Sequence, residues 1–316
     1  MNTSPLIGEL NTTPSPGLGC AAFGGTHWGV QDDRDSMAAL ATAIEAGVRH
    51  IDTAAAYGSG RSETLIGNLI RRRPSVRDGL LIASKGGIKG SKKNFLKEID
   101  NSRRRLGCEV IDIYYIHWPM EGVDPIPSLE ALAEAKEKHT IRYVGVSNFT
   151  SRQLTLAHGN LPLDACQFGY NLIWRHPDTG IIPLCGQLGI ARIAYGALAQ
   201  GLLSGNYQPW SRFPEGDDRD HTAFFSDDHA VELTAGLSTL KALCAQYHVP
   251  LRSAALHWIS SREYLEGSLA GARTAEQAKE NFQLQRIDSE LLDKLHVAGK
   301  EISTCFGNTE NFFRMQ

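Results

Sequence analysis

The 316-residue sequence has no stretch that approaches ~18 unbroken apolar residues, the length that a membrane-spanning helix needs. Its first residues have neither a basic nor an apolar segment, so they do not resemble a secretory signal. The net charge is only −3, which gives no general attraction to nucleic acids or to anionic membranes. We therefore expect a cytoplasmic protein without a nucleic-acid or membrane partner.

The sequence also lacks any CxxC pair, although it contains 6 cysteines scattered along the chain. This distribution argues against a disulfide framework and against a zinc knuckle. There is no HExxH motif or other histidine cluster, so we expect no metal site. What is present is ordinary for a globular protein with a substantial core, since 42% of the residues are hydrophobic and 21% are charged.

Short apolar segments alternate with helix-like segments along the chain. Eight strands in alternation with helices predict a parallel sheet buried on both faces, and this number of units fits a closed (β/α)₈ TIM barrel. An open doubly wound sheet is the alternative. We expect one domain over residues 1–316, with a short hairpin or irregular arm at 5–16 and an additional C-terminal helix at 289–303. The predicted strands are 17–25, 48–53, 80–84, 110–117, 141–146, 163–170, 190–195 and 264–270.

One apparent nucleotide motif is rejected. Residues 17–22, GLGCAA, match the loose pattern G-x-G-x-x-A. The dinucleotide fingerprint requires a strand before these glycines, and no credible strand precedes Gly17.

Polar side chains follow most of the predicted strands. Because the active sites of barrel enzymes lie at the C-terminal ends of the strands, these side chains are expected to share one face of the barrel. They are Asp52, Tyr57, Lys85, His117, Ser147, Asn148, Gln167, Asn171, Tyr195 and Arg273.

Four of these residues, Asp52, Tyr57, Lys85 and His117, together suggest a chemistry that none of them suggests alone. An ammonium near Tyr57 favours the ionised phenol, and Asp52 would keep Lys85 charged. His117 could then orient a carbonyl oxygen. None of the four is a good nucleophile or metal ligand in this arrangement, so proton transfer to an oxygen remains, with a cofactor supplying the reducing equivalent.

Six sequence blocks, which occur in family order between Gly17 and about Leu284, resemble the aldo-keto reductase family. The resemblance implies a (β/α)₈ barrel that transfers hydride between NADPH, or less often NADH, and an aldehyde or ketone. It also implies that Asp52, Tyr57, Lys85 and His117 form the catalytic tetrad, with Tyr57 as general acid. The blocks are GVRHIDTAAAYGSGRSETLIG, ASKGG, IDIYYIHWP, IRYVGVSNF, GALAQGLLSG and GARTAEQAKEN.

The same resemblance implies a set of cofactor-binding residues. Ser147, Asn148 and Gln167 would hold the nicotinamide carboxamide, and Tyr195 would stack on its ring. A loop after Tyr195 would cover the pyrophosphate, and residues near the last barrel helix would bind the adenosine end. The loop residues are Gly196, Leu198, Gln200, Gly201, Leu203 and Gly205. The residues at the adenosine end are Gly271, Arg273, Gln277, Glu280 and Asn281.

The charges near these blocks favour NADPH while leaving NADH possible. Arg273 stands just before the helix that begins at Ala275, where a guanidinium and free N–H donors together suit a phosphate. Asn206 replaces a lysine that is frequent in relatives, which weakens this preference, and Arg212 is a candidate to compensate.

The predicted substrate is a small aldehyde, ketone or sugar, and the sequence gives no oligomeric state. The substrate-facing candidates are Trp28 and Trp118, together with Tyr57 and His117. The mixed polar and aromatic loop 209–225 would suit a sugar or polyol. The alternatives are an NAD-linked aldose dehydrogenase that works in the oxidative direction and a nucleotide-sensing accessory subunit. The loop residues concerned are Trp210, Arg212, His221, Phe224 and Phe225.

Overall fold

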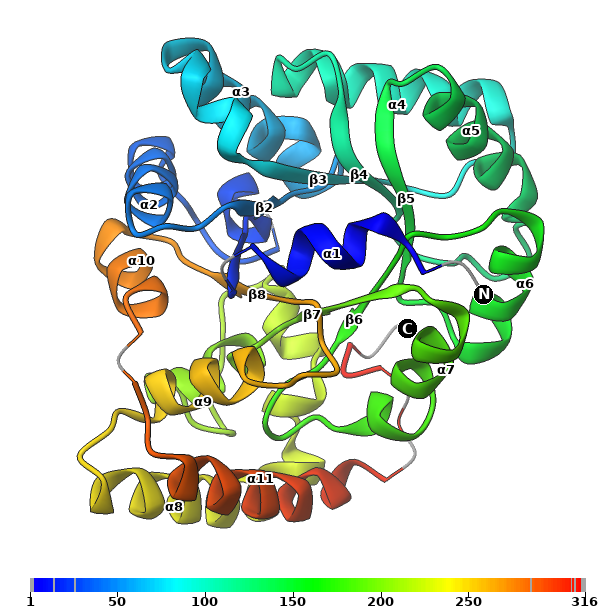
Figure 1. The fold of residues 1–316 in the computed structure, drawn as a ribbon. Helices are drawn as coiled ribbons and strands as arrows, with labels where there is room; N and C mark the ends of the chain where they lie inside the picture. Colours follow the sequence, from blue (N-terminus) through cyan, green and yellow to red (C-terminus); the bar gives the residue numbers. More distant parts are fainter. Residues whose placement is uncertain are drawn as a thin grey trace.

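Eight parallel strands form a closed barrel in the computed structural model, which describes residues 3–313 except 14, 26, 285, 308 and 310 (Figure 1). Each strand pairs with the next, and β8 pairs with β1 through Gly17–Leu269, Leu18–Ala270 and Gly19–Gly271. The closed (β/α)₈ barrel is therefore confirmed, and the open-sheet alternative is excluded. The strands are β1 (Gly17–Gly19), β2 (His50–Asp52), β3 (Leu81–Gly86), β4 (Ile111–Ile116), β5 (Ile141–Ser147), β6 (Ala165–Gly169), β7 (Ala191–Tyr195) and β8 (Gly267–Gly271).

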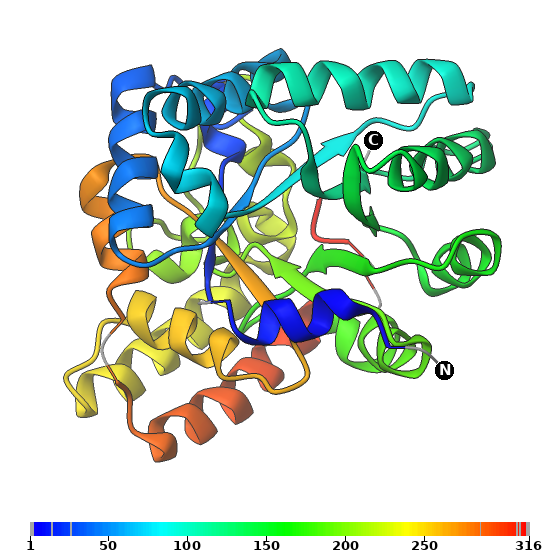
Figure 2. The same cartoon turned by 45° about the horizontal axis from the view of Figure 1, so that its top comes forward.

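Helices surround the barrel, as Figure 2 shows in a second orientation. Their ends follow local signals: the Ser91 side chain caps α4 by accepting a hydrogen bond from the Asn94 amide, and Gly107 ends this helix at φ 65°. The expected C-terminal helix is present as α11 and packs against α8 (Figure 1). The helices are α2 (Asp33–Glu45), α3 (Arg61–Arg72), α4 (Lys92–Leu106), α5 (Ile126–Glu137), α6 (Ser151–Asn160), α7 (Ile181–Leu188), α8 (Ala230–Gln246), α9 (Leu251–Ser260), α10 (Ala275–Phe282) and α11 (Ser289–Ser303).

The N-terminal segment differs from the hairpin or irregular arm expected at 5–16. It forms helix α1 (Pro5–Asn11), which lies across one end of the barrel in Figure 1. Pro5 occupies the first turn, where a missing N–H is tolerated, and the Ser4 hydroxyl accepts a hydrogen bond from the Leu6 amide. Leu6 and Leu10 are four residues apart, so both point into the barrel and are buried there. The helix closes the N-terminal end of the barrel, where Leu10 lies beside Gly267 at the start of β8.

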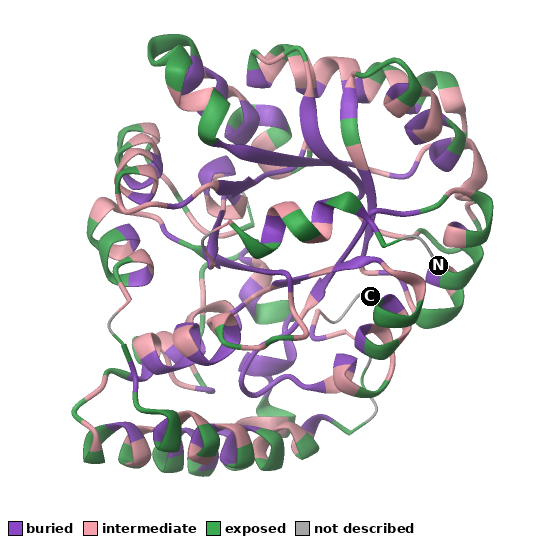
Figure 3. Cartoon of the chain, in the orientation of Figure 1, coloured by how far each residue is buried: buried purple, intermediate pink, exposed green. Residues whose placement is uncertain are grey.

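Polar residues in the barrel interior gather toward its opposite, C-terminal end. All six residues of β3 and all six of β4 are buried, and Figure 3 shows the strands as a buried layer inside the helices. Leu81 and Ile113 pack with Leu6 near the N-terminal end. Lys85 and Asp52, in contrast, stand at the C-terminal ends of β3 and β2, where a pocket opens.

None of the described helices is both long and apolar enough to cross a membrane. The six cysteines of the sequence are all free in the structure. No group of three or more His, Cys, Asp or Glu side chains within the described residues is placed to hold a metal ion.

Candidate active site

Two glycines place Tyr57 above the end of β2. Tyr57 begins the short 3₁₀ helix η2 (Tyr57–Gly60), whose second residue, Gly58, has φ 57° and so favours glycine. The backbone of Gly58 contacts the backbone of Gly24 so closely that a Cβ atom added to Gly24 would lie 2.3 Å from the Gly58 nitrogen. This close contact between the chain after β1 and the chain after β2 fixes the position of the tyrosine.

Lys85 and Asp52 form a buried ion pair beneath the tyrosine. Only 1% of the Lys85 side chain and 4% of the Asp52 side chain are exposed. The Lys85 Nζ donates hydrogen bonds to Asp52 Oδ1 and, at 2.9 Å, to the Thr53 carbonyl. The second carboxylate oxygen, Asp52 Oδ2, accepts a hydrogen bond of 2.8 Å from Gln167 Nε2. The ammonium is therefore held in one position, 5.3 Å from the centre of the Tyr57 ring.

Tyr57 faces the pocket with its pKa raised well above the usual value. Burial is the main cause, and the negative charge of Asp52 acts in the same direction. This shift is opposite to the one expected from the Lys85 charge alone, because burial of the phenol is the largest influence on its pKa. The phenol consequently keeps its proton at neutral pH, as a general acid must before it donates.

His117 lies beside Tyr57, with ring centres 5.5 Å apart and an angle of 79° between the rings. Burial, with the Lys85 charge as a smaller cause, lowers the pKa of His117 to about 3. The imidazole is therefore neutral above mildly acidic pH, with one ring N–H that can donate and one nitrogen that can accept. Its backbone is fixed by a hydrogen bond of 2.9 Å from its amide to the Gly86 carbonyl.

Two histidines with lowered pKa values, His50 in the core and His117 in the pocket, predict a pH dependence of stability. Burial lowers the pKa of His50 to about 4, and that of His117 is about 3. Each folded-state pKa lies below the pKa of a histidine in the unfolded chain. The stability that the neutral histidine contributes to the folded protein is therefore fully present above pH ~6.5, and it is lost as the pH falls toward the folded-state pKa. For each group we expect the free energy of unfolding to fall by about 1.4 kcal/mol per pH unit in this window. His50→Gln should reduce the slope, measured by urea unfolding between pH ~6.5 and ~4.5, by about that amount. An unchanged slope would show that His50 is protonated in the folded protein.

The residues expected around the nicotinamide carboxamide form one hydrogen-bonded arc at the ends of β4 to β7. Tyr195 donates its hydroxyl hydrogen to Asn148 Oδ1 at 2.6 Å. Asn148 Nδ2 donates to Ser147 Oγ at 2.9 Å and to the His117 carbonyl at 3.1 Å. Asn148 adopts the left-handed backbone conformation, φ 64°, which asparagine tolerates better than most residues. The arc connects residues expected to bind the cofactor with His117, one of the four residues expected to be catalytic.

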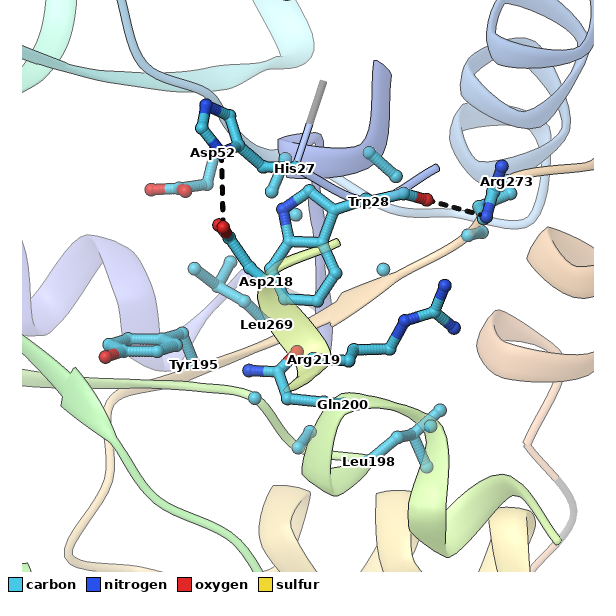
Figure 4. Close-up of a pocket in the computed structure, with 18 of the residues that line it drawn as sticks. His27, Trp28, Asp52, Tyr195, Leu198, Gln200, Asp218, Arg219, Leu269 and Arg273 are labelled. Atoms are coloured by element: carbon cyan, nitrogen blue, oxygen red, sulfur yellow. Dashed lines mark hydrogen bonds and ion pairs between the residues drawn. The ribbon is translucent and has the colours of Figure 1, made fainter. Parts of the chain in front are cut away.

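A pocket of about 720 Å³ brings together most of the predicted site, as Figure 4 shows in part. Asp52, Tyr57 and His117 line it, whereas Lys85 lies buried below. The expected substrate residues Trp28 and Trp118 also line it. The expected cofactor residues that line it are Ser147, Asn148, Gln167, Tyr195, Gly196, Leu198, Gln200, Gly201, Gly271, Arg273, Gln277 and Asn281.

Four expected cofactor residues do not line this pocket. Leu203 is fully buried in the core, and Gly205 lies outside the lining. Arg212 is exposed and pairs with Asp227, so it does not take the place of the missing lysine. Glu280 pairs with Arg252 instead of facing the pocket.

The expectation that loop 209–225 presents its aromatic residues to substrate is largely wrong. Phe224 and Phe225 are buried, and Phe224 packs against Trp174. Trp210 is 54% exposed and lies outside the lining. Of the loop residues that the sequence singled out, His221 reaches the pocket.

Sequence reasoning missed several residues that line the pocket. Arg219 forms a two-point ion pair with Asp217, at 2.8 Å for Nε–Oδ1 and 2.6 Å for Nη2–Oδ2, and lies 4.0 Å from the centre of the Phe213 ring. Phe313 arrives from the C-terminal end of the chain and contacts both pocket tryptophans. No motif marks these positions; the only signal is the charged run 217–221. The missed residues include His27, Asp218, Arg219, Arg252 and Phe313.

The sequence suggested that the Arg273 guanidinium and the free N–H donors of the following helix suit a phosphate, and in the structure this guanidinium has protein partners. Its Nη1 donates to the Trp28 carbonyl at 2.9 Å, its Nη2 to the Val30 carbonyl, and its Nε to Gln31 Oε1 at 2.8 Å. Figure 4 shows the bond to Trp28. The arginine thus connects the chain after β8 to the chain after β1 at the edge of the pocket, one residue before the cap of α10.

The pocket suits a nicotinamide dinucleotide. Its volume lies within the range of cofactor sites. Asn281 Oδ1 is buried on the lining without a hydrogen-bond partner among the described residues, although Asn281 Nδ2 donates to the Gly271 carbonyl at 2.8 Å. A buried acceptor of this kind is costly unless a ligand or water donates to it. The amino group of an adenine is such a donor, and Arg273 lies nearby for phosphate.

Comparisons with known proteins agree with this fold. A family model described as the aldo/keto reductase family matches residues 17–296, so the chain belongs to the aldo-keto reductase family of oxidoreductases. The chain is 33% identical to the aldo-keto reductase YhdN of Bacillus subtilis over 268 residues, which cover 81% of this chain and 80% of YhdN. It is 30% identical to an NADH-specific methylglyoxal reductase of Escherichia coli over 318 residues, covering 91% and 94%. Among solved structures, a glycerol dehydrogenase of Gluconobacter oxydans superimposes with a TM-score of 0.79 at 26% identity, covering 94% and 93%.

Proposed function

We propose that this protein is an NADPH-dependent reductase of small aldehydes, ketones or sugars in which Tyr57 is the general acid. The observation that carries the proposal is the position of Tyr57 beside His117 and above the buried Lys85–Asp52 pair. Names of relatives point the same way, since one of them reduces methylglyoxal.

The mechanism follows from the positions of these side chains. When bound, the nicotinamide supplies the hydride that reduces the carbonyl carbon. The neutral His117 donates a hydrogen bond that orients the carbonyl oxygen, and Tyr57 gives its proton to the oxygen as negative charge develops there. The resulting phenolate lies close to the ammonium of Lys85, which Asp52 and Gln167 hold in place. Lys85 therefore stabilises the charge that Tyr57 acquires during the step, even though it does not ionise the resting phenol.

The direction and the cofactor are part of the same proposal. We propose the reductive direction because one relative is named a methylglyoxal reductase, whereas in the aldose dehydrogenase alternative the same tyrosine would act as the base. Arg273 at the start of α10 supports NADPH, as its guanidinium can exchange backbone partners for a phosphate. NADH remains the competing cofactor, because the methylglyoxal reductase relative is named as specific for it.

Titration with each nucleotide, followed by turnover assays, tests the proposal. Trp28 lines the pocket, so its fluorescence should change on binding, and we expect the Kd for NADPH to be about tenfold lower than that for NADH. Methylglyoxal, glyceraldehyde and propanal should then be reduced with NADPH. Tighter binding of NADH would contradict the cofactor assignment. Tight binding of NADPH without turnover of any carbonyl compound would instead favour a nucleotide-sensing subunit.

A further inference from the structure

Two consecutive residues of the connection between β7 and α8, Asp218 and Arg219, carry opposite charges and both line the pocket. Figure 4 shows that their side chains diverge, with the Arg219 guanidinium extending toward Arg273 and away from Asp218. Asp217 holds Arg219 in this direction through its two-point ion pair. The loop therefore places one positive and one negative side chain in different parts of a single pocket.

The positive charges lie toward the nucleotide end. In the part of the chain that the structure describes, the pocket lining contains no lysine, and its arginines are Arg219, Arg252 and Arg273. Arg252 pairs with Glu280 of α10, the helix that supplies the adenosine-end residues. These cations are in the region that the phosphates of the cofactor would occupy.

The negative charge of Asp218 acts on the catalytic end. Its field reaches Tyr57, where it contributes to the raised pKa of the phenol. Its carboxylate is 36% exposed, and Oδ1 lies 3.1 Å from Nδ1 of His27, which is 63% exposed. A backbone hydrogen bond of 2.6 Å from the Asp218 amide to the His27 carbonyl fixes the loop against the chain after β1.

Aromatic side chains complete this end of the pocket. Phe313 packs edge-on against Trp28 and Trp118, with ring centres 6.4 Å and 6.0 Å away. Such a wall suits a small carbon skeleton, and the carboxylate at its rim accepts hydrogen bonds from hydroxyl groups but repels anions.

We propose that Asp218 makes the enzyme selective for uncharged, hydroxylated aldehydes over aldehydes that carry a phosphate or carboxylate. This proposal rests on the carbonyl reductase function proposed above. A hydroxyl group on the carbon chain of the substrate donates to the Asp218 carboxylate, while a phosphate or carboxylate in place of that hydroxyl meets a like charge in a partly desolvated pocket. Like charges under these conditions lower binding and turnover by about tenfold or more.

Glyceraldehyde and glyceraldehyde 3-phosphate are the matched probes, since they share the reacting carbonyl and differ in the charged group. We expect wild-type kcat/KM with saturating NADPH to be at least about 30-fold higher for glyceraldehyde. Asp218→Asn should reduce this ratio by about tenfold, because the repulsion of the phosphate is removed. Glu215→Gln is the control: it removes one negative charge from an exposed position of the same loop, outside the pocket, and should leave the ratio unchanged.

The wild-type ratio tests the proposal without any variant. Equal kcat/KM for the two probes would overturn it, and so would an Asp218→Asn protein that reduces glyceraldehyde with an unchanged ratio. An equal reduction of the ratio in Glu215→Gln would show that the net charge of the loop, rather than Asp218 in the pocket, is responsible. Propanal, which has no hydroxyl group, separates failure of this proposal from failure of the proposed function. Turnover of propanal together with equal kcat/KM for the two glyceraldehyde probes would overturn the role of Asp218 alone. No turnover of any aldehyde would overturn the proposed function as well.

Discussion

Tyr57→Phe is expected to lower kcat for aldehyde reduction by about 10³-fold, within the range for loss of a general acid. The phenylalanine ring fills the same space between Gly58 and His117, so the pocket keeps its shape. The developing alkoxide loses its proton donor, however, and the neutral His117 offers a hydrogen bond but no readily released proton. NADPH affinity should remain within about threefold, because no cofactor residue is changed.

The measurement is steady-state turnover with NADPH and glyceraldehyde, together with a fluorescence titration of the nucleotide. Tyr143→Phe serves as the matched control, since it makes the same chemical change in β5, where the hydroxyl donates to Glu9 near the N-terminal end of the barrel. That variant should keep wild-type kcat. Near wild-type turnover by Tyr57→Phe would remove Tyr57 from the mechanism and leave His117 as the proton donor.

The barrel could be predicted from the sequence because each strand is marked by its own residues. Runs such as Leu81–Ala83 and Ile113–Ile116 are apolar, short and bounded by helix signals. Parallel pairing then places the ends of neighbouring strands on one face, so Asp52 and Lys85 had to lie near each other. The pairing of Asp52 with Ala83, two residues before Lys85, shows this register directly.

The N-terminal helix was missed because a turn signal outweighed a weaker helical one. Residues 11–14, NTTP, suggested a hairpin, but Asn11 instead ends α1 and Thr12 caps it. Leu6 and Leu10 lie on one side of a helix only seven residues long, too short for periodicity alone to establish. Their burial depends on the open end of the barrel, which is a tertiary feature.

The electrostatics of the site depend on geometry in a similar way. From the sequence, Lys85 was expected to ionise Tyr57, but the effect of an ammonium depends on what else it contacts. Its hydrogen bonds to Asp52 and to the Thr53 carbonyl leave burial as the dominant influence on the phenol. Arg273 is a comparable case, since its partners are carbonyls of a loop more than 240 residues away in sequence.

The loop 209–225 shows why composition alone did not locate the substrate residues. Its aromatic residues were expected in the pocket, yet Phe225 packs against Phe213 of the same loop and against Tyr207 just before it, with ring centres 4.7 Å and 6.2 Å away. Burial of aromatic area stabilises the loop, and the charged residues between them reach the pocket instead. Only the three-dimensional path of the loop reveals that Asp218 and Arg219 face different parts of the pocket.

Lys85→Met is expected to reduce both activity and stability. Methionine retains the length and volume of the lysine stem, but it leaves the Asp52 carboxylate buried without its cation. Breaking a buried pair in this way typically costs about 3–5 kcal/mol in the free energy of unfolding. Turnover should fall by about 10²-fold or more, since the phenolate formed at Tyr57 loses the neighbouring positive charge.

The double variant Asp52→Asn/Lys85→Met separates these two effects. Asparagine removes the uncompensated charge and can still accept the hydrogen bond from Gln167, so urea unfolding should show recovery of at least about 2 kcal/mol relative to Lys85→Met. Turnover should not recover, because the ammonium near Tyr57 is still absent. Failure of the second substitution to restore stability would mean that lost packing around residue 85, and not the unpaired carboxylate, destabilises the single variant. Recovery of turnover in the double variant would show that an unbalanced negative charge, rather than the missing ammonium, had inactivated Tyr57.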